Sequence, residues 1–424
     1  MQPPLPDLAP PSAPPAAGPL RVEVARSVAD LRRHAAAYES FAARLTQGGS
    51  LFYSLPWLEI YTAVYVTPER GMHFLLAWQG DTIVGVAPLQ LEQKSLTRGR
   101  VRRLFCWGNV HGSLMIEGRF LIPEAADIER CVEAFAAHVL DPRSGEVDCF
   151  EFHYLDEHAP EFAAVQRHFK PQSTDAEEMP SYQMVLPATF EAYAQTLTGS
   201  ALMKVRNRWR ALQKAGRLEF LPVTRLSEAE LAQVMQMHLG RQDLLRERGR
   251  ARQSLFQEPH LRDAYLKLLE QAANDGSARH YLLKVDGTLV CFGLGFHRGD
   301  TMIYHLTAFD PDWGRFEPGR VFWFLMLQAE IERGQTRLID ALPGITKVKQ
   351  DFSNAKRTYR CLAGTKPDSL RARVKVGTWR AGVAAAEHLR GWRERRRAPD
   401  VQEVPGVPLP GAVTADAAAP PPER

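Results

Sequence analysis

Three apolar runs joined by two tight turns lie within residues 278–310, and they strongly constrain the fold of this chain. The runs turn at Asp286-Gly287 and at Arg298-Gly299-Asp300, which are residue types that favour hairpin turns. The segment therefore predicts a meander of three antiparallel strands. Amphipathic patterns predict further elements around it, with helices over 200–215, 228–248, 259–273 and 317–333 and strands over 336–341 and 356–363.

The first half of the chain repeats this order of elements. A helix is predicted over 35–45, and a hairpin over 73–93 turns at Gln79-Gly80-Asp81. A chain of 424 residues exceeds what one hydrophobic core normally holds. We therefore expect two α/β units from a tandem duplication, over 20–184 and 185–365. Further elements of the first unit are a helix over 125–140 and strands over 101–107, 113–118 and 147–155.

The two ends of the chain differ in composition from the rest. Residues 1–19 and 399–424 are rich in Pro and Ala and poor in large apolar side chains, so we expect disordered tails. Residues 366–398 predict a basic helix that contacts an anionic membrane surface or docks on the protein. The N-terminus lacks the features of a secretory signal, and no run reaches the ~18 apolar residues of a membrane span. We expect a cytoplasmic protein.

Charge and cysteine content argue against several function classes. The chain has 53 Lys and Arg against 49 Asp and Glu, and a net charge of +4 does not favour a DNA-binding protein. Its 5 cysteines form no CxxC pair, so we expect reduced thiols and neither a disulfide framework nor a metal site. The absence of GxxxxGK[ST] and GxGxxG runs argues against nucleotide hydrolysis and dinucleotide redox chemistry.

The loop that follows the meander combines features of an anion-binding turn. Pro318 suits the first turn of a helix, and Gly319 lets a ligand approach the backbone. The free backbone N–H groups of Gly319, Arg320 and Val321 would point toward an anion such as pyrophosphate. Arg315 and Arg320 would add positive charge. The alternative is an ordinary loop capped by Pro-Gly before a buried helix.

Several stretches resemble the CelD-like acetyltransferase family, a branch of the GNAT superfamily that is named for cellulose-biosynthesis operons and related to the Fem aminoacyltransferases. The resemblance covers most of residues 20–365. The chain departs from the family at Glu317, where the family has the Ser of a Ser-Pro-Gly turn, and at Val348, where it has a Tyr before a lysine. The matching stretches are ALMKVRNRWRALQKAGRLEF, LLKVDGTLVCFGLGFHRGDTMIYHLTAFDPDWGRFEPGR, LIDALPGITKVKQDF and SLFYSLPWLEI.

The resemblance implies two GNAT-like units, each a mixed, mostly antiparallel sheet flanked by helices, with the acyltransferase domain at 185–365. It implies transfer of an acyl group from acetyl-CoA or another acyl-CoA, without a metal, to an amine or hydroxyl. The expected acceptor is a polysaccharide, a cell-envelope component or an amino sugar. Two alternatives stay open: an aminoacyl-tRNA-dependent Fem-like transferase, and a non-catalytic scaffold of a polysaccharide synthase complex. Glu317 and Val348 favour the scaffold, since an anionic Glu317 would repel a phosphate.

Four residues are candidates for the chemistry, which needs a base for the acceptor and a donor for the developing oxyanion. Asp340 ends a predicted strand and is a base, a group that holds the acceptor, or a structural residue. Lys349 matches the family lysine and stabilises the carbonyl oxygen or an acceptor phosphate, or it is a solvated charge. Tyr304 and His305 are neighbours on a strand and therefore face opposite sides. His305 is a base or a core histidine.

The pocket is expected between the two units, at the C-terminal ends of the central strands of the second unit. The strand that ends at Asp310 and the strand that ends at Asp340 should then be neighbours. They should splay apart so that an extended ligand enters between them.

Overall fold

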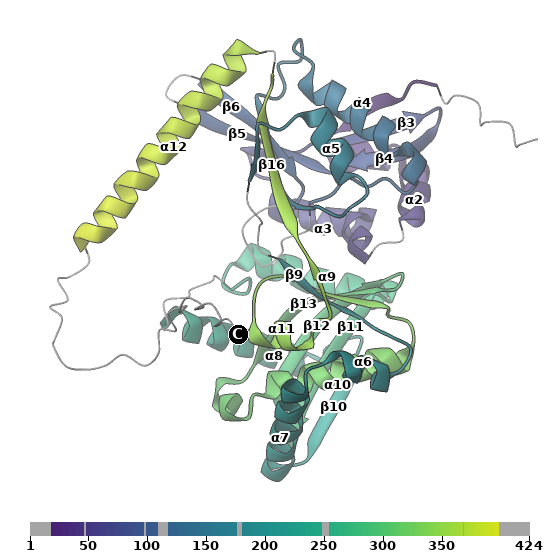
Figure 1. Cartoon of the computed structure of the whole chain (residues 1–424), viewed down its shortest axis with the longest axis vertical. Helices are drawn as coiled ribbons and strands as arrows, with labels where there is room; N and C mark the ends of the chain where they lie inside the picture. The colour runs from purple at the N-terminus through teal and green to yellow at the C-terminus, as the bar shows by residue number, and fades with distance from the viewer. Residues whose placement is uncertain are drawn as a thin grey trace, which may run out of the picture. The chain divides into compact units, whose positions relative to one another are not determined.

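The computed structural model describes residues 18–45, 48–96, 99–108, 118–175, 180–247, 254–367 and 369–397 (Figure 1). The predicted tails lie outside these ranges apart from residues 18 and 19, as does most of the strand predicted over 113–118. The elements of the first half are β1 (Arg21–Ala25), α1 (Val28–Arg32), α2 (Ala35–Arg44), η1 (Gly48–Tyr53), α3 (Leu55–Tyr65), β2 (Arg70–Met72), β3 (Phe74–Gln79), β4 (Thr82–Ala87), β5 (Leu89–Leu96), β6 (Gly99–Cys106), η2 (Ala125–Asp127), α4 (Ile128–Leu140), β7 (Cys149–Asp156), α5 (Phe162–Phe169), β8 (Ser173–Asp175) and β9 (Ser181–Val185).

The helices predicted in the second half are confirmed to within a few residues. The α7 helix begins after Thr198, whose side chain accepts a hydrogen bond from the N–H of Ala201, and it ends at Gly216. The elements are α6 (Phe190–Thr196), α7 (Gly199–Ala215), β10 (Leu218–Val223), α8 (Glu228–Glu247), α9 (Pro259–Asp275), β11 (Ala278–Val285), β12 (Thr288–Arg298), β13 (Thr301–Phe309), η3 (Pro311–Phe316), α10 (Pro318–Arg333), β14 (Leu338–Pro343), α11 (Lys347–Phe352), β15 (Ala355–Arg357), β16 (Tyr359–Thr365) and α12 (Leu370–Arg397).

Two sheets are described in the first half. One has the strand order β1-β3-β4 and is antiparallel. The other has the order β2-β5-β6-β7-β16-β8, and its pairs are antiparallel except for β6 with β7. Apolar side chains of α4, such as Val132 and Phe135, share a buried core with Leu75 of β3 and Phe152 of β7. The helix therefore joins the two sheets into one packed layer structure.

One seven-stranded sheet forms the second half, in the order β10-β11-β12-β13-β14-β9-β15. Its pairs are antiparallel except for β13 with β14. The α10 side chain of Phe322 packs on the β10 side chain of Phe220, whereas Leu268 of α9 shares a different core with Phe292 of β12. The two helices thus cover opposite faces of the sheet (Figure 1). The predicted class, α/β with mixed and mostly antiparallel sheets flanked by helices, is confirmed.

The two halves share part of their core. Trp57 of α3 lies edge-on to Phe296 of β12, with ring centroids 5.0 Å apart, and its indole N–H donates to Asp275 at 3.0 Å. Tyr61 of α3 and Tyr265 of α9 belong to the same buried cluster. Burial of these large aromatic side chains stabilises the contact between the halves, since each contributes much apolar area.

The strand predicted over 356–363 forms two strands in different sheets. The β15 strand pairs with β9 in the second-half sheet, whereas β16 pairs with β7 and β8 in the first-half sheet. Ion pairs fix this crossing: Arg357 contacts Asp156 at 3.2 Å, and Arg360 contacts Glu157 at 2.7 Å. The strands β9 and β16 thus each pair in a sheet of the other half, although the domain boundaries drawn from the sequence stay a prediction.

A helix also occupies the basic segment predicted over 366–398. Near the start of α12, Lys375 contacts Asp148 at 3.2 Å. A second compact unit begins at Gly377. Across the described ranges, no helix has both the length and the apolar character needed to cross a bilayer. Contact of α12 with a membrane surface stays a prediction.

Gly364→Ala should destabilise the protein through the first-half sheet. A Cβ at Gly364 of β16 would overlap the ring of Phe150 in β7. Because overpacking a core costs about 1–3 kcal/mol, we expect the free energy of unfolding in urea to fall by that amount. Gly199→Ala is the control, since an added Cβ there meets nothing within 4 Å. Equal stability of the two variants would contradict the packing of β16 on β7.

Candidate functional site

An extra residue interrupts the regular pairing of β13. Leu294 of β12 pairs with Leu306, but the next residue, Gly295, pairs with Tyr304. His305 is therefore left over as a β-bulge, a feature that bends a strand and re-aims its side chains. The position of the bulge matters because it lies two residues after Ile303, the last residue of β13 that pairs with β14.

Pairing between β13 and β14 is short. It runs from Thr301 with Leu338 to Ile303 with Asp340 and then ends, although both strands continue. The two strands are therefore neighbours that stop pairing before their C-terminal ends, as predicted from the sequence. Their backbone groups beyond this point need partners from elsewhere.

Cationic side chains from two helices donate hydrogen bonds to some of these backbone carbonyl oxygens. Arg241 of α8 donates to the Thr307 carbonyl oxygen at 3.0 Å. The Lys349 ammonium of α11 donates to the carbonyl oxygens of Ala341 at 2.7 Å and Leu342 at 3.1 Å. Lys349 is thus held against the end of β14 rather than in solvent. Its predicted action on a substrate oxygen stays a prediction.

The predicted anion-binding turn directly follows β13. The short helix η3 leads to Glu317, which has a left-handed backbone conformation with φ of 48°, and α10 begins at Pro318. A Cβ at Gly319 would meet only Phe309 Cδ1, at 3.8 Å, so the space above this residue is open. Arg315 is exposed and lies over the ring of Phe316, 4.7 Å from its centroid.

Glu317 belongs to a network of paired charges. Its carboxylate contacts Arg208 of α7 at 2.6 Å and Arg320 at 3.2 Å. Burial raises the pKa of Glu317, but the bonds from Arg320 and Arg208 outweigh this and hold the pKa below its usual value. Arg320 is buried and also contacts Asp351 at 2.7 Å, and Asp351 contacts Lys347 at 2.9 Å. The anionic charge of Glu317 is therefore compensated by two guanidinium groups.

The contact of Arg208 with the turn before α10 is not predicted from the sequence. Arg208 occupies the polar face of an amphipathic helix, where a charge is normally solvated. Its guanidinium also lies 3.3 Å from the Arg315 carbonyl oxygen, so α7 contributes to the turn before α10. Only the tertiary contact between α7 and η3 reveals this, because the two segments are far apart in the chain.

Tyr304 and His305 face opposite sides of the sheet, as the two-residue period of a strand predicts. Tyr304 packs against Trp323 of α10, with ring centroids 4.4 Å apart, and burial raises its pKa well above the usual value. His305 stacks on Tyr265 of α9 at 5.5 Å. Burial lowers the pKa of His305 to about 4, so the imidazole is neutral at pH 7. Neither ring nitrogen has a hydrogen-bond partner among the described residues.

Asp340 is buried and surrounded by donors. Its carboxylate accepts hydrogen bonds from the Ser181 hydroxyl at 2.5 Å and the Gln183 amide at 2.9 Å. It also accepts from the backbone N–H of Leu342 at 2.8 Å, and Arg357 lies 3.5 Å away. These contacts tie β14 to β9 and β15. They favour the structural alternative for Asp340, while its action as a base stays a prediction.

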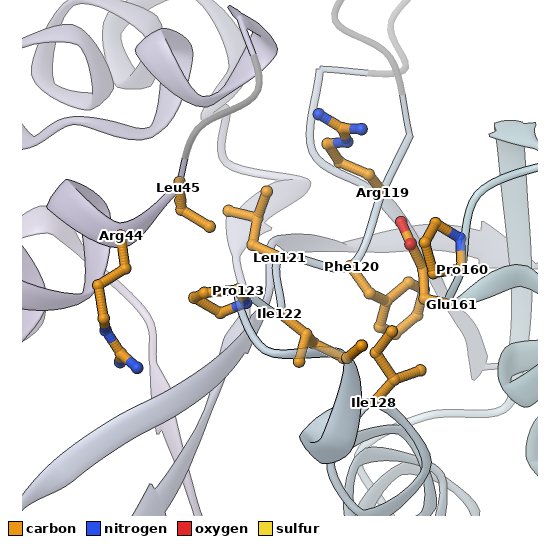
Figure 2. Close-up of a pocket in the computed structure, with 11 residues that line it drawn as sticks. Arg44, Leu45, Arg119, Phe120, Leu121, Ile122, Pro123, Ile128, Pro160 and Glu161 are labelled. Carbon is orange, nitrogen blue, oxygen red and sulfur yellow. The ribbon is translucent and has the colours of Figure 1, made fainter. Parts of the chain in front are cut away.

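A separate pocket of about 130 Å³ lies in the first half, at the start of α4 (Figure 2). Arg44, Arg119 and Glu161 contribute its charged groups, and its lining includes none of the site residues predicted from the sequence. The pocket expected between the two units stays a prediction.

The second half of the chain is similar to a known protein family. Residues 199–350 match the model of the "Acetyltransferase (GNAT) domain" family. No curated protein matches the sequence. The crystal structure of FemX is similar at a TM-score of 0.52 and 10% sequence identity, over 76% of this chain and 94% of that chain. This likeness concerns the fold.

Two further solved structures align less closely. One is the C-terminal domain of a putative lysylphosphatidylglycerol synthetase from Agrobacterium fabrum, with a TM-score of 0.48 and 13% identity over 82% of this chain and 95% of that chain. The other is a tandem GNAT protein of the clavulanic acid biosynthesis pathway, with a TM-score of 0.46 and 10% identity over 82% of this chain and 100% of that chain.

The matched range contains the parts that the residues themselves single out, namely the bulged strand β13, the turn before α10, the parting of β14 and the lysine of α11. Residues 199–350 are thus similar to an acetyltransferase domain of the GNAT superfamily.

Proposed function

We propose that the chain transfers an acyl group from acyl-CoA to an amine of a saccharide or cell-envelope acceptor. The observation that carries this proposal is the parting of β13 and β14 beside the His305 bulge, with an open helix N-terminus following directly. An extended thioester entering between the strands would bring its carbonyl close to His305. The CelD-like resemblance, the exopolysaccharide context and a cytoplasmic location belong to the same proposal.

The donor is held by its pyrophosphate at the start of α10. The backbone N–H groups of Gly319 and Val321 would face the anion, and Arg315 would add charge from the exposed side of η3. The N–H of Arg320, expected from the sequence to be free, instead donates to the Glu317 carbonyl oxygen at 3.0 Å. The pairing of Glu317 with Arg208 and Arg320 removes the repulsion that the sequence alone predicts. This favours an enzyme over the scaffold alternative.

The chemical step needs two proton transfers. The neutral amine attacks the thioester carbonyl carbon, the C–N bond forms, and the C–S bond breaks. In this proposal His305 takes the proton that the amine loses, because its imidazole is neutral and its nitrogens are unpaired among the described residues. The leaving thiolate takes its proton from solvent, because Tyr304 is buried against α10 on the face of the sheet opposite to His305. Exchange with solvent then restores the neutral imidazole of His305.

Lys349 and Asp340 act on the strand rather than on the acyl group. Lys349 holds the carbonyl oxygens at the end of β14, and Asp340 fixes β14 to β9. Both keep the two strands apart at the distance that an extended donor needs. The aminoacyl-tRNA-dependent alternative uses the same step with an ester donor, so the donor assay separates the two.

Gly319→Asp should weaken donor binding. The new carboxylate would lie where the pyrophosphate sits, and like charges about 4 Å apart repel by about 1–4 kcal/mol between water and a protein surface. We expect calorimetry with acetyl-CoA to show at least a fivefold weaker affinity by that estimate, where ~1 kcal/mol is about fivefold. Gly319→Ala is the control, because the added Cβ makes an ordinary contact. Unchanged affinity in Gly319→Asp would place the pyrophosphate elsewhere.

His305→Gln should lower turnover without changing donor affinity. Loss of a general base typically costs about 10²–10⁴-fold, so single-turnover transfer to an amine acceptor should fall within that range. Tyr265→Phe is the matched control, since it keeps the ring that stacks on His305 and removes only a hydroxyl. Circular dichroism would confirm that both variants fold. Full turnover in His305→Gln would remove this residue from the mechanism.

Lys349→Ala should also reduce turnover, for a geometric reason. Without the ammonium, the carbonyl oxygens of Ala341 and Leu342 lose their donor and the end of β14 shifts. A misplacement of ~1 Å costs about 10²-fold in rate. Gln350→Ala on the same helix is the control, since its side chain is exposed and bonds the Tyr182 hydroxyl rather than β14. Equal turnover of both variants would show that Lys349 does not position the site.

A further inference from the structure

Two histidines and a glutamate from three separate segments of the first half meet in space. His73 lies between β2 and β3, His138 lies in the last turn of α4, and Glu146 lies in the loop before β7. The nearest ligand atoms of the three side chains all lie within 4.8 Å of one another. The cysteine pattern predicts no metal site, but these three ligands include no cysteine.

A buried imidazole belongs to this cluster. His73 is only 1% exposed, and its ligand atom lies within 4.8 Å of those of His138 and Glu146. Most buried polar side-chain atoms in proteins have a protein or water partner. A bound metal ion would be such a partner for the imidazole nitrogen of His73 that faces the cluster.

We propose that His73, His138 and Glu146 bind one divalent metal ion of the zinc class. Two imidazole nitrogens and one carboxylate oxygen form a common ligand set for Zn²⁺, with water at the fourth position. Tetrahedral ligands at about 2.1 Å from zinc lie roughly 3.4 Å apart, so the side chains must close in slightly. His138 and Glu146 are partly exposed and have room to do so.

Arg26 competes with the ion for Glu146. Its guanidinium contacts a Glu146 carboxylate oxygen at 2.7 Å, and 56% of its side chain is exposed. The side chain can therefore swing into solvent when the ion binds. Because a nearby positive charge repels the ion, removal of Arg26 should tighten binding, whereas a purely structural ion pair predicts no effect on metal affinity.

The ion would join the β2–β3 connection, the end of α4 and the loop before β7. It would stabilise the first half and takes no part in the transfer step proposed for the second half. The inference is therefore independent of the proposed function, and its test needs no donor or acceptor.

The experiment is calorimetric titration of the full chain with Zn²⁺ after treatment with a chelator. We expect one ion per chain, with a higher melting temperature in its presence. His138→Ala and Glu146→Gln should each weaken binding by about 100-fold, since loss even of an outer-shell partner typically costs about 10–100-fold. Both side chains are partly exposed, so these variants should fold even if a change at His73 does not. Arg26→Ala should bind severalfold tighter.

Two controls exclude other metal-binding groups. His168→Ala removes a histidine that contacts Glu129 at 2.7 Å, and Cys361→Ser removes a thiol 3.9 Å from His153 Nε2. Both should keep the wild-type affinity. Absence of stoichiometric binding, unchanged affinity in His138→Ala or Glu146→Gln, loss of binding in a control, or unchanged affinity in Arg26→Ala would each overturn the proposal.

Discussion

The parting of β13 from β14 is the constraint on which the site depends. Two parallel strands that stop pairing must find other partners for their backbone groups, because an unpaired buried carbonyl costs about 1–3 kcal/mol. The chain meets this demand with long cationic side chains, Arg241 on one strand and Lys349 on the other. An opening inside a sheet is thereby kept stable, and α8 and α11 are drawn against its two sides.

The turn before α10 shows a similar coupling of charge and backbone. Glu317 occupies a left-handed conformation directly before Pro318, and its negative charge by itself looks unfavourable for an anion site. The structure surrounds it with Arg208 and Arg320, and Asp351 and Lys347 continue the network. The charge that would repel a phosphate thus becomes the group that orders the arginines around the turn.

Much of the second half follows from its pattern. Gly/Asp turns and the two-residue period locate the meander, and they place Tyr304 and His305 on opposite faces. The caps and the apolar face of α7 locate that helix. These features are local, and each depends on a few neighbouring residues.

The features that the sequence does not reveal depend on contacts between segments that lie far apart in the chain. The bulge at His305 depends on the register between two strands, and the contacts of Asp340 depend on the return of β9 beside β14. The division of the 356–363 segment between two sheets depends on pairing with β9, β7 and β8, and ion pairs of Arg357 with Asp156 and of Arg360 with Glu157 accompany it. The cluster of His73, His138 and Glu146 likewise exists only once helix and sheet have packed.

The pairing of β16 with β7 and of β9 with β14 affects how the chain can be made. During synthesis, the first-half sheet cannot close until the residues of β16 have left the ribosome, long after β7 has emerged. Domains usually fold as units beginning at the N-terminus. Here β7 keeps an unpaired edge until β16 has been synthesised. The sheets of both halves are therefore completed only late in translation.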